Sequence, residues 1–239
     1  MGKQVAIIGL GRFGTSLATT LYKTGYEVLA IDKASDLVEN IGPLVTHAVR
    51  LNATNEAALM KLGINKFDVA VVTIGASIQD SVMITILLKK LGVGYIVARA
   101  DNELHGSILE SIGADKVIFP ERDTADRTGP ILTMRGVADF IPLENGSGII
   151  KAKATPYFVG KTLEDIGFGS VTKSGGSVVL MIQRGKEGIV NPSVQEVVSH
   201  IDILIMAGNN MEIERLLEKT DPPNKENGDK KRGSGSGKS

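Results

Sequence analysis

The stretch from Lys3 to Asp32 restricts the fold of this chain more than any other. It reads KQVAIIGLGRFGTSLATTLYKTGYEVLAID. A β-branched apolar run at 5–8 leads into a Gly-x-Gly-x-x-Gly pattern, apolar residues then recur at helical spacing, and a second apolar run ends at Asp32. The order of strand, glycine turn, helix, strand and acid is typical of the opening unit of an α/β sheet that binds a nucleotide.

Each glycine of the pattern has its own physical task. Gly9 permits the tight turn off the strand, Gly11 lets a phosphate group approach the backbone, and Gly14 lets the helix pack close to the strand. The helix N-terminus offers free N–H groups and the positive end of a dipole to the phosphates. Asp32 is placed to accept both hydroxyls of an adenosine ribose. The alternative is a similar α/β unit that binds no nucleotide.

The same alternation of strands and helices continues to residue 119. Further strands are predicted at 46–51, 67–73, 95–98 and 116–119, and helices at 35–41, 55–62, 78–91 and 103–112, with Asn55 as an N-cap. Six strands alternating with helices predict an α/β fold with a Rossmann-like, doubly wound parallel sheet. Such a sheet is buried on both faces, which explains its continuous apolar runs.

Ligands of doubly wound sheets bind outside the carboxyl ends of the strands. We expect these ends to form one crevice, with a nucleotide held by Gly9, Gly11, Arg12, Phe13, Gly14, Asp32, Lys33, Asn52, Ala53, Thr54, Ile74, Gly75, Ala76, Arg99, Ala100, Asp101, His105 and Glu121. His105 is included because it lies near the Arg99 edge. The alternative for His105 is a histidine on a helix face with a local hydrogen bond.

The pattern changes after residue 120. A helix is predicted at 121–134, interrupted by Pro130 because proline lacks a backbone donor and crowds the preceding turn. This segment is either an arm that crosses to a partner subunit or a simple connector. We therefore predict a nucleotide-binding domain at 1–120, a connector at 121–136, an α+β domain at 137–220 and a disordered tail at 221–239, which is poor in apolar residues.

The second domain is predicted to be small and irregular. Strands are expected at 139–143, 148–154, 178–182, 188–190 and 201–207, a short helix at 161–166, a turn at 175–176 and a terminal helix at 210–218. The runs 178–182 and 188–190 are expected to pair as a hairpin.

Composition excludes several function classes. Lys plus Arg and Asp plus Glu number 27 each, and a net charge of zero argues against a nucleic-acid partner. Cysteine is absent, so there is no thiolate metal site and no cysteine nucleophile. No N-terminal signal pattern precedes the first strand, and no apolar run approaches the roughly 18 residues that span a bilayer. We expect a soluble protein.

The sequence offers a nucleotide site without an attached reaction. The three histidines, His47, His105 and His200, form no pair at metal-ligand spacing, and we expect His47 and His200 at the surface. A dehydrogenase needs a general acid or base beside the nicotinamide, and the second domain supplies no candidate. We therefore expect a sensor and not an enzyme. The alternative is an NAD(H)-dependent oxidoreductase or a redox sensor.

Charged residues narrow the choice of nucleotide. The carboxylate of Asp32 would repel a 2′-phosphate, which disfavours NADP. Arg12 and Arg99 concentrate positive charge on the phosphate side, which suits a triphosphate. We expect ATP or ADP, with NAD(H) as a competitor.

Several motifs carry a resemblance to one family. They are GLGRFG at 9–14, NAT at 52–54, IGA at 74–76, ARA at 98–100, IFPERD at 118–123, FVGKTL at 158–163 and VNPS at 190–193. With these motifs in order, the chain resembles, over about residues 1–220, the RCK-domain proteins of the Ktr and Trk type that regulate bacterial potassium uptake. The resemblance implies a cytoplasmic subunit on the inner face of the cell membrane. It also implies homodimers assembled into an octameric ring beneath a membrane potassium channel subunit, which the ring opens or closes with its ligand.

The resemblance also implies roles for single residues. Arg12 and Arg99 would contact the phosphates, with His105 nearby, and Asp32 would contact the ribose. Asn52 and Ala53 would border the adenine, and Ile74 to Ala76 would border the ribose and phosphates. Glu121 would hold a divalent cation or Na⁺ beside the terminal phosphate, across the dimer. Many relatives carry Asp where this chain has Asn52. In some relatives the second domain binds cyclic di-AMP, and such contacts would fall at Arg184, Asn191 and Pro192. The alternative there is ordinary surface and turn residues.

Overall fold

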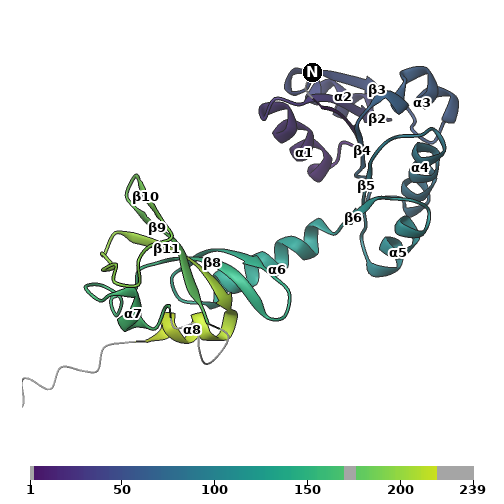
Figure 1. Cartoon of the computed structure of the whole chain (residues 1–239). Coiled ribbons are helices and arrows are strands. Elements are labelled where there is room, and N and C mark those ends of the chain that lie inside the picture. The colour runs from purple at the N-terminus through teal and green to yellow at the C-terminus, as the bar shows by residue number, and fades with distance from the viewer. Residues whose placement is uncertain (1–2, 170–175, 220–239) are drawn as a thin grey trace, which may run out of the picture. The chain divides into compact units, whose positions relative to one another are not determined.

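The chain divides into two compact units, each of which is described by itself. The computed structural model describes residues 3–169 and 176–219 (Figure 1). The units are Met1–Arg122 and Asp123–Ser239. The division falls inside helix α6, Pro120–Thr133, which lies in the segment predicted to be the connector.

The first unit contains a six-stranded parallel sheet with the order β3-β2-β1-β4-β5-β6. The strands are β1 (Gln4–Ile8), β2 (Glu27–Asp32), β3 (His47–Arg50), β4 (Val69–Val72), β5 (Ile96–Arg99) and β6 (Lys116–Ile118). The predicted doubly wound sheet is confirmed. The direction of winding reverses between β1 and β4, and this switch point is where such sheets leave a crevice for a ligand.

Helices cover both faces of this sheet. They are α1 (Arg12–Lys23), α2 (Ser35–Ile41), α3 (Glu56–Leu62), α4 (Ile78–Lys90) and α5 (Glu103–Ser111), with short 3₁₀ turns at η1 (Gly42–Leu44) and η2 (Ile64–Lys66). Because successive strand residues point to opposite faces, Ile7 packs in the cluster with Ala18 of α1, while Ile8 packs with Ile84 of α4. Complete burial of one such isoleucine contributes about 1.5–3 kcal/mol. Asn55 caps α3 as predicted, since its side chain accepts from the N–H of Ala58.

The second unit is built on a five-stranded antiparallel sheet with the order β10-β9-β11-β8-β7. The strands are β7 (Val137–Pro142), β8 (Ser147–Lys153), β9 (Val178–Arg184), β10 (Glu187–Val190) and β11 (Asp202–Asn209). Helices α7 (Leu163–Ile166) and α8 (Asn210–Glu218) complete the core, which contains Phe158, Phe168 and Leu204. Both the α+β class and the β9–β10 hairpin are confirmed.

One predicted feature is wrong. The interruption expected at Pro130 does not occur, because α6 continues through it to Thr133 and the N–H of Met134 donates to the carbonyl of Pro130 at 2.9 Å. No residue of α6 is buried. The turn predicted at 175–176 falls partly outside the described residues, and the tail predicted at 221–239 falls wholly outside them. Across 3–169 and 176–219, none of the helices has the length and apolar character needed to cross a membrane.

Candidate functional site

A cavity of 420 Å³ opens at the carboxyl end of the parallel sheet. It brings together side chains and backbone from the ends of all six strands. The predicted residues that line it are Gly9, Gly11, Arg12, Phe13, Asp32, Lys33, Asn52, Ala53, Thr54, Ile74, Gly75, Ala76, Arg99 and Glu121. Its volume lies within the range of small-molecule and cofactor sites.

Four predicted residues do not line the cavity, and several unpredicted ones do. The four are Gly14, Ala100, Asp101 and His105; the unpredicted ones are Ile8, Leu10, Ile31, Leu51, Thr73, Ser77, Asp80 and Ile84. Ser77 caps α4 by accepting from the N–H of Asp80 at 3.1 Å, and Asp80 pairs with Lys33 at 3.3 Å. The spacing Ser-x-x-Asp before an apolar helix is the signal that could have placed both residues at this edge.

The glycine turn has the geometry that its sequence predicts. Gly9 takes a φ of +104°, which side chains rarely adopt, and its carbonyl accepts from the hydroxyl of Thr73 at 2.6 Å. A Cβ on Gly14 would lie 2.0 Å from that same carbonyl oxygen. A Cβ on Gly11 would meet no protein atom within 4 Å. No protein atom therefore restricts the residue at 11, and this open space is compatible with the predicted approach of a ligand to the backbone.

The N-terminus of helix α1 lacks the side-chain hydrogen-bond acceptors that most other helices have at their first turn. Side chains cap α3, α4, α5, α7 and α8, and each of these helices has an acidic residue in its first turn. Helix α1 has neither, and its first residue, Arg12, makes no ion pair within the described part of the chain. Free N–H groups, the helix dipole and an unpaired guanidinium together make this end of the cavity a site for an anion.

Asp32 has a structural task in addition to its predicted contact with ribose. One carboxylate oxygen accepts from the N–H of Leu10 at 2.7 Å, and the other accepts from the N–H of Ala34 at 2.9 Å. These bonds tie the glycine turn to the start of α2. Each oxygen can accept a further bond, so both ribose hydroxyls can still be held.

The guanidinium of Arg99 lies against the backbone of Gly75. A Cβ at position 75 would be 1.8 Å from Nη1 of Arg99, so a larger residue there would require the guanidinium end of Arg99 to shift. Nη2 donates to Glu121 and forms an ion pair with Asp101, each at 2.9 Å. Asp101 thus positions Arg99 without lining the cavity itself.

His105 is buried behind this edge, not in the cavity. It is 1% exposed, and its Nδ1 accepts from the N–H of Asp101 at 3.4 Å. Burial lowers the pKa of His105, the charge of Asp101 opposes this, and Arg99 lowers the pKa further, so the imidazole is neutral at pH 7. The local hydrogen bond corresponds to the alternative stated for His105. His47 and His200 are exposed, as predicted.

The side chain of Asn52 is held by the turn that it begins. Its Oδ1 accepts from both the N–H and the hydroxyl of Thr54, at 3.1 and 2.8 Å. An aspartate could accept the same two bonds, so the turn does not depend on which of the two residues is present. The difference lies in the other half of the side chain, where asparagine offers N–H donors and aspartate an acceptor.

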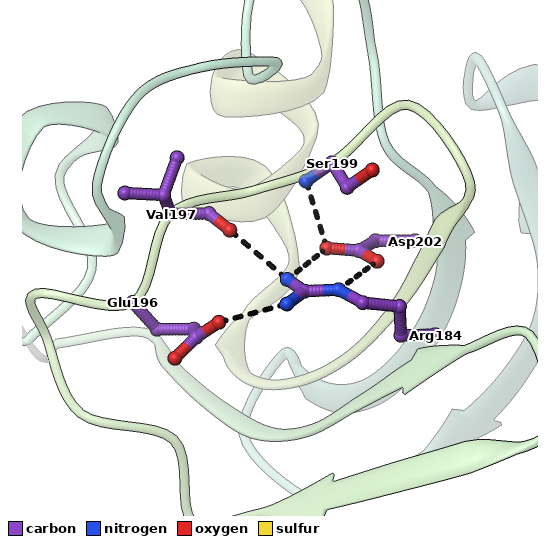
Figure 2. Close-up of polar contacts among 5 residues, drawn as sticks. All are labelled: Arg184, Glu196, Val197, Ser199 and Asp202. Atoms are coloured by element: carbon purple, nitrogen blue, oxygen red, sulfur yellow. Dashed lines mark hydrogen bonds and ion pairs between the residues drawn. The ribbon is translucent and has the colours of Figure 1, made fainter.

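In the second unit, the side chain of Arg184 forms hydrogen bonds with other residues of the same unit (Figure 2). Its Nε and Nη2 donate to the two oxygens of Asp202 at 2.9 and 2.8 Å, its Nη1 donates to Glu196 at 3.1 Å, and Nη2 also reaches the carbonyl of Val197 at 3.0 Å. The N–H of Ser199 donates to Asp202 at 2.8 Å. A ligand that used Arg184 would have to compete with four hydrogen bonds, and the predicted contact with cyclic di-AMP stays a prediction.

Protonation of Asp202 should destabilise the second unit in acid. Burial raises the pKa of Asp202, but hydrogen bonds from Arg184 and from the N–H of Ser199 outweigh it and leave the pKa below its usual range. The stability that ionised Asp202 contributes is therefore fully present above about pH 4, the pKa of an aspartate in the unfolded chain. It is lost as the pH falls through the lower pKa that Asp202 has in the folded protein. Urea unfolding between pH 7 and pH 2.5 should show this loss, and Arg184→Met should reduce the part of it that lies below pH 4.

Metal ligands do not cluster in the part of the chain that the structure covers. No group of three or more histidine, aspartate and glutamate side chains there could hold a metal ion. Glu121 faces Arg99 instead. Its predicted role beside a cation stays a prediction.

Comparison with known proteins places both units in one family. The model of the TrkA-N domain matches residues 5–120. Ktr system potassium uptake protein C of Bacillus subtilis (strain 168) is 38% identical over 216 residues, which are 90% of this chain and 96% of that protein. Ktr system potassium uptake protein A of the same organism is 36% identical over 214 residues, which are 90% and 95% of the two chains.

Solved structures support the fold. The GsuK RCK domain superposes with a TM-score of 0.62 at 18% identity, covering 92% of this chain and 48% of that one. The GsuK channel bound to NAD superposes with a TM-score of 0.60 at 18% identity, covering 92% of this chain and 40% of that one. This chain therefore spans less than half the length of those structures. At such identity the likeness concerns the fold alone.

Proposed function

This chain belongs to the family of the Ktr system potassium uptake proteins, and from that premise we propose that it is the nucleotide-sensing regulatory subunit of a membrane potassium transporter. The observation that carries the proposal is the cavity of 420 Å³, which joins a glycine turn, an uncapped helix and Asp32. It has the features of a nucleotide site. Binding there would shift a conformational equilibrium that opens or closes the channel subunit.

We propose an adenosine nucleotide as the ligand. Asp32 would hold the ribose, while Arg12, Arg99 and the start of α1 would face the phosphates. Two cations favour ATP and ADP, and NAD(H) competes because it carries the same adenosine and because a protein of similar fold, the GsuK channel, has a structure bound to NAD. A divalent cation or Na⁺ at Glu121 and cyclic di-AMP at the second unit belong to the same proposal.

We also propose that the subunit acts as a homo-oligomer in the cytoplasm, at the inner face of the membrane. Homodimers assembled into an octameric ring would be attached to the channel subunit. In support, no residue of α6 is buried within this chain, and Leu132 on this helix is 79% exposed. Contact with a second protein surface would remove this apolar side chain from water, which is favourable.

We propose that the protein is not an enzyme. The cavity lining contains no histidine, and each carboxylate in it has a cationic or backbone N–H partner: Asp32 holds Leu10 and Ala34, Asp80 pairs with Lys33, and Glu121 pairs with Arg99. An oxidoreductase needs a proton donor or acceptor beside the nicotinamide. Turnover of NADH with hydroxy acids, aldehydes or imines would contradict this part of the proposal.

The direct test is equilibrium binding of ATP, ADP and NADH to the purified chain, with particle mass and hydrodynamic radius recorded in each state. We expect a particle of several subunits whose radius differs between ATP and ADP. A monomer that binds none of the three ligands would contradict the proposed function.

Arg12→Gln should lower the affinity of the protein for ATP by about tenfold and its affinity for NADH by less. The change removes a charge-assisted hydrogen bond to a phosphate, worth about 1.5–3 kcal/mol, and Arg12 is exposed, which favours the lower end. The matched control is Lys23→Gln, which removes the same charge from the last turn of the same helix. Calorimetric titration at two salt concentrations measures both variants. Equal affinity of Arg12→Gln and the unaltered protein for ATP would contradict the phosphate contact.

A further inference from the structure

The amino ends of the six parallel strands form the edge of the sheet opposite to the cavity. Hydrogen bonds join the segments that precede neighbouring strands there. The N–H of Glu27 donates to the carbonyl of Lys3 at 3.3 Å, and the N–H of Gln4 donates to Asp68 at 2.7 Å. The carbonyl of Tyr95 accepts from an N–H of β4 at 2.9 Å. The first residues of the strands, with the segments directly before them, therefore lie side by side in a row that we call the amino edge.

Exposed tyrosines gather at the amino edge. Tyr26 directly precedes β2, Tyr95 directly precedes β5, and Tyr22 lies in the last turn of α1. These three residues are 39%, 42% and 44% exposed, and Leu44, before β3, is 43% exposed. Within residues 3–169 and 176–219, the three hydroxyls make no hydrogen bond and the three rings make no ring contact. An exposed ring with a free hydroxyl suits a boundary between water and an apolar phase.

Lysines without a carboxylate partner share this edge. Lys3 directly precedes β1, Lys66 comes shortly before β4, Lys116 begins β6, and Lys23 ends α1. All four are exposed, and none of them forms an ion pair in the part of the chain that the structure describes. Their ammonium groups are therefore available to an anionic surface outside the protein.

The carboxylates of the amino edge are used by the fold. Glu27 accepts from the side chain of Gln4 at 2.6 Å, and Asp68 accepts from the N–H of the same residue at 2.7 Å. Asp115 accepts from the first N–H of β5 at 2.7 Å and pairs with Lys89 at 3.6 Å. The last helical turns at this edge add charges that balance one another, namely Lys61, Lys90, Glu39 and Glu110. The four unpaired lysines thus leave a local positive excess, although the whole chain has 27 residues of each sign.

We propose that the amino edge docks on the surface of a membrane that contains anionic phospholipids. Tyrosine and lysine side chains are both favourable at such a surface, because the ring meets the apolar boundary while the hydroxyl and the ammonium stay in water beside the headgroups. Each lysine adds attraction to the lipid phosphates. Since the cavity lies at the other edge of the sheet, docking leaves it open to its ligand. The inference goes beyond the nucleotide site and does not depend on which ligand that site holds.

The test is flotation of the full chain, without nucleotide, with vesicles of two compositions. One is phosphatidylcholine alone, which has no net charge, and the other also contains phosphatidylglycerol. We expect the protein to float with the anionic vesicles only, and to bind them less as salt is raised from about 0.01 to 0.15 M, because salt shortens the range of the attraction. Equal flotation with both compositions, or with neither, would overturn the inference.

Lys3→Gln and Lys66→Gln should each lower the partition coefficient onto anionic vesicles by about fivefold, because each removes one charge close to the lipid surface. The matched control is Arg50→Gln. It removes an exposed charge from the carboxyl end of β3, at the opposite edge of the same sheet and outside the cavity lining, and should leave partitioning unchanged. A loss for Arg50→Gln as large as that for Lys3→Gln would assign binding to overall charge and overturn the inference.

A fluorescent reporter tests the orientation without changing any charge. The chain contains no tryptophan, so Tyr95→Trp places a single one at the amino edge. Its emission should shift to shorter wavelength on anionic vesicles, because the ring leaves water. Tyr157→Trp, in the second unit, is the control and should show no shift. Vesicle-bound protein with no shift at position 95 would mean that another surface contacts the lipid, against the inference.

Failure of this inference is distinguishable from failure of the proposed function. A thermal melt of each variant verifies that it is folded. Nucleotide titration of the unaltered protein without vesicles tests the cavity alone. Nucleotide binding without vesicle binding would overturn the docking surface and leave the proposed function standing, while vesicle binding without nucleotide binding would do the reverse.

Discussion

Asp32→Ala should lower the affinity of the protein for ATP, ADP and NADH alike, each by about a hundredfold or more. The variant loses the acceptor for two ribose hydroxyls, and each hydrogen bond to a charged group is worth about 1.5–3 kcal/mol. It also frees the N–H groups of Leu10 and Ala34, which Asp32 holds at 2.7 and 2.9 Å, so the glycine turn is less well ordered. Titration with the three ligands measures the loss, which should be equal because the ribose is common to all.

Asp36→Ala is the matched control for Asp32→Ala. It removes an exposed carboxylate from the first turn of α2, four residues along the chain, and leaves the cavity unchanged. A thermal melt without ligand separates lost binding from lost folding. If Asp32→Ala bound all three ligands as the unaltered protein does, the ribose would have to lie elsewhere in the cavity.

Arg184→Met should destabilise the second unit by about 3 kcal/mol. The change leaves Asp202, whose side chain is 0% exposed, as a buried charge without its partner, which typically costs about 3–5 kcal/mol. The lower value is expected because the side chain of Arg184 is 29% exposed and water can reach the gap. Urea unfolding of the full chain, followed by hydrogen exchange in β9 and β11, measures the effect where the pair lies.

Two further variants test the cause. Arg215→Met removes a cation from the exposed side of α8 in the same unit and should cost less than about 0.5 kcal/mol, as surface changes usually do. The double variant Arg184→Met, Asp202→Leu replaces the pair with apolar side chains and should recover much of the loss. A double variant as unstable as Arg184→Met would mean that the other bonds of Arg184, to Glu196 and Val197, carry the stability.

The position of the cavity could be predicted because it depends on chain order more than on single contacts. Once the strands alternate with helices, right-handed connections bring their carboxyl ends to one edge, and Asp32, Ile74 and Arg99 must meet there. What an individual side chain does at that edge could not be predicted. Arg99 ends strand β5 and Asp101 follows it, and both are charged, yet Arg99 lines the cavity and Asp101 does not.

Arg184 and Pro130 show two other limits of sequence patterns. The partners of Arg184 lie 12 and 18 residues away. Asp202 meets it through the pairing of β9 with β11, and Glu196 reaches it from the segment before β11, which no local pattern specifies. Pro130 was expected to interrupt its helix on intrinsic preference. The helix nevertheless continues through the proline to Thr133, which intrinsic preference alone does not predict.

The contact between Gly75 and Arg99 has a consequence for substitutions at either position. The backbone at 75 and the guanidinium at 99 share one small volume, in which a Cβ would lie 1.8 Å from Nη1. A larger residue at 75 would require the guanidinium of Arg99 to move from its present position in the cavity. Substitutions at the two positions are therefore not independent. A side chain at 75 would therefore change where the cavity carries the positive charge of Arg99.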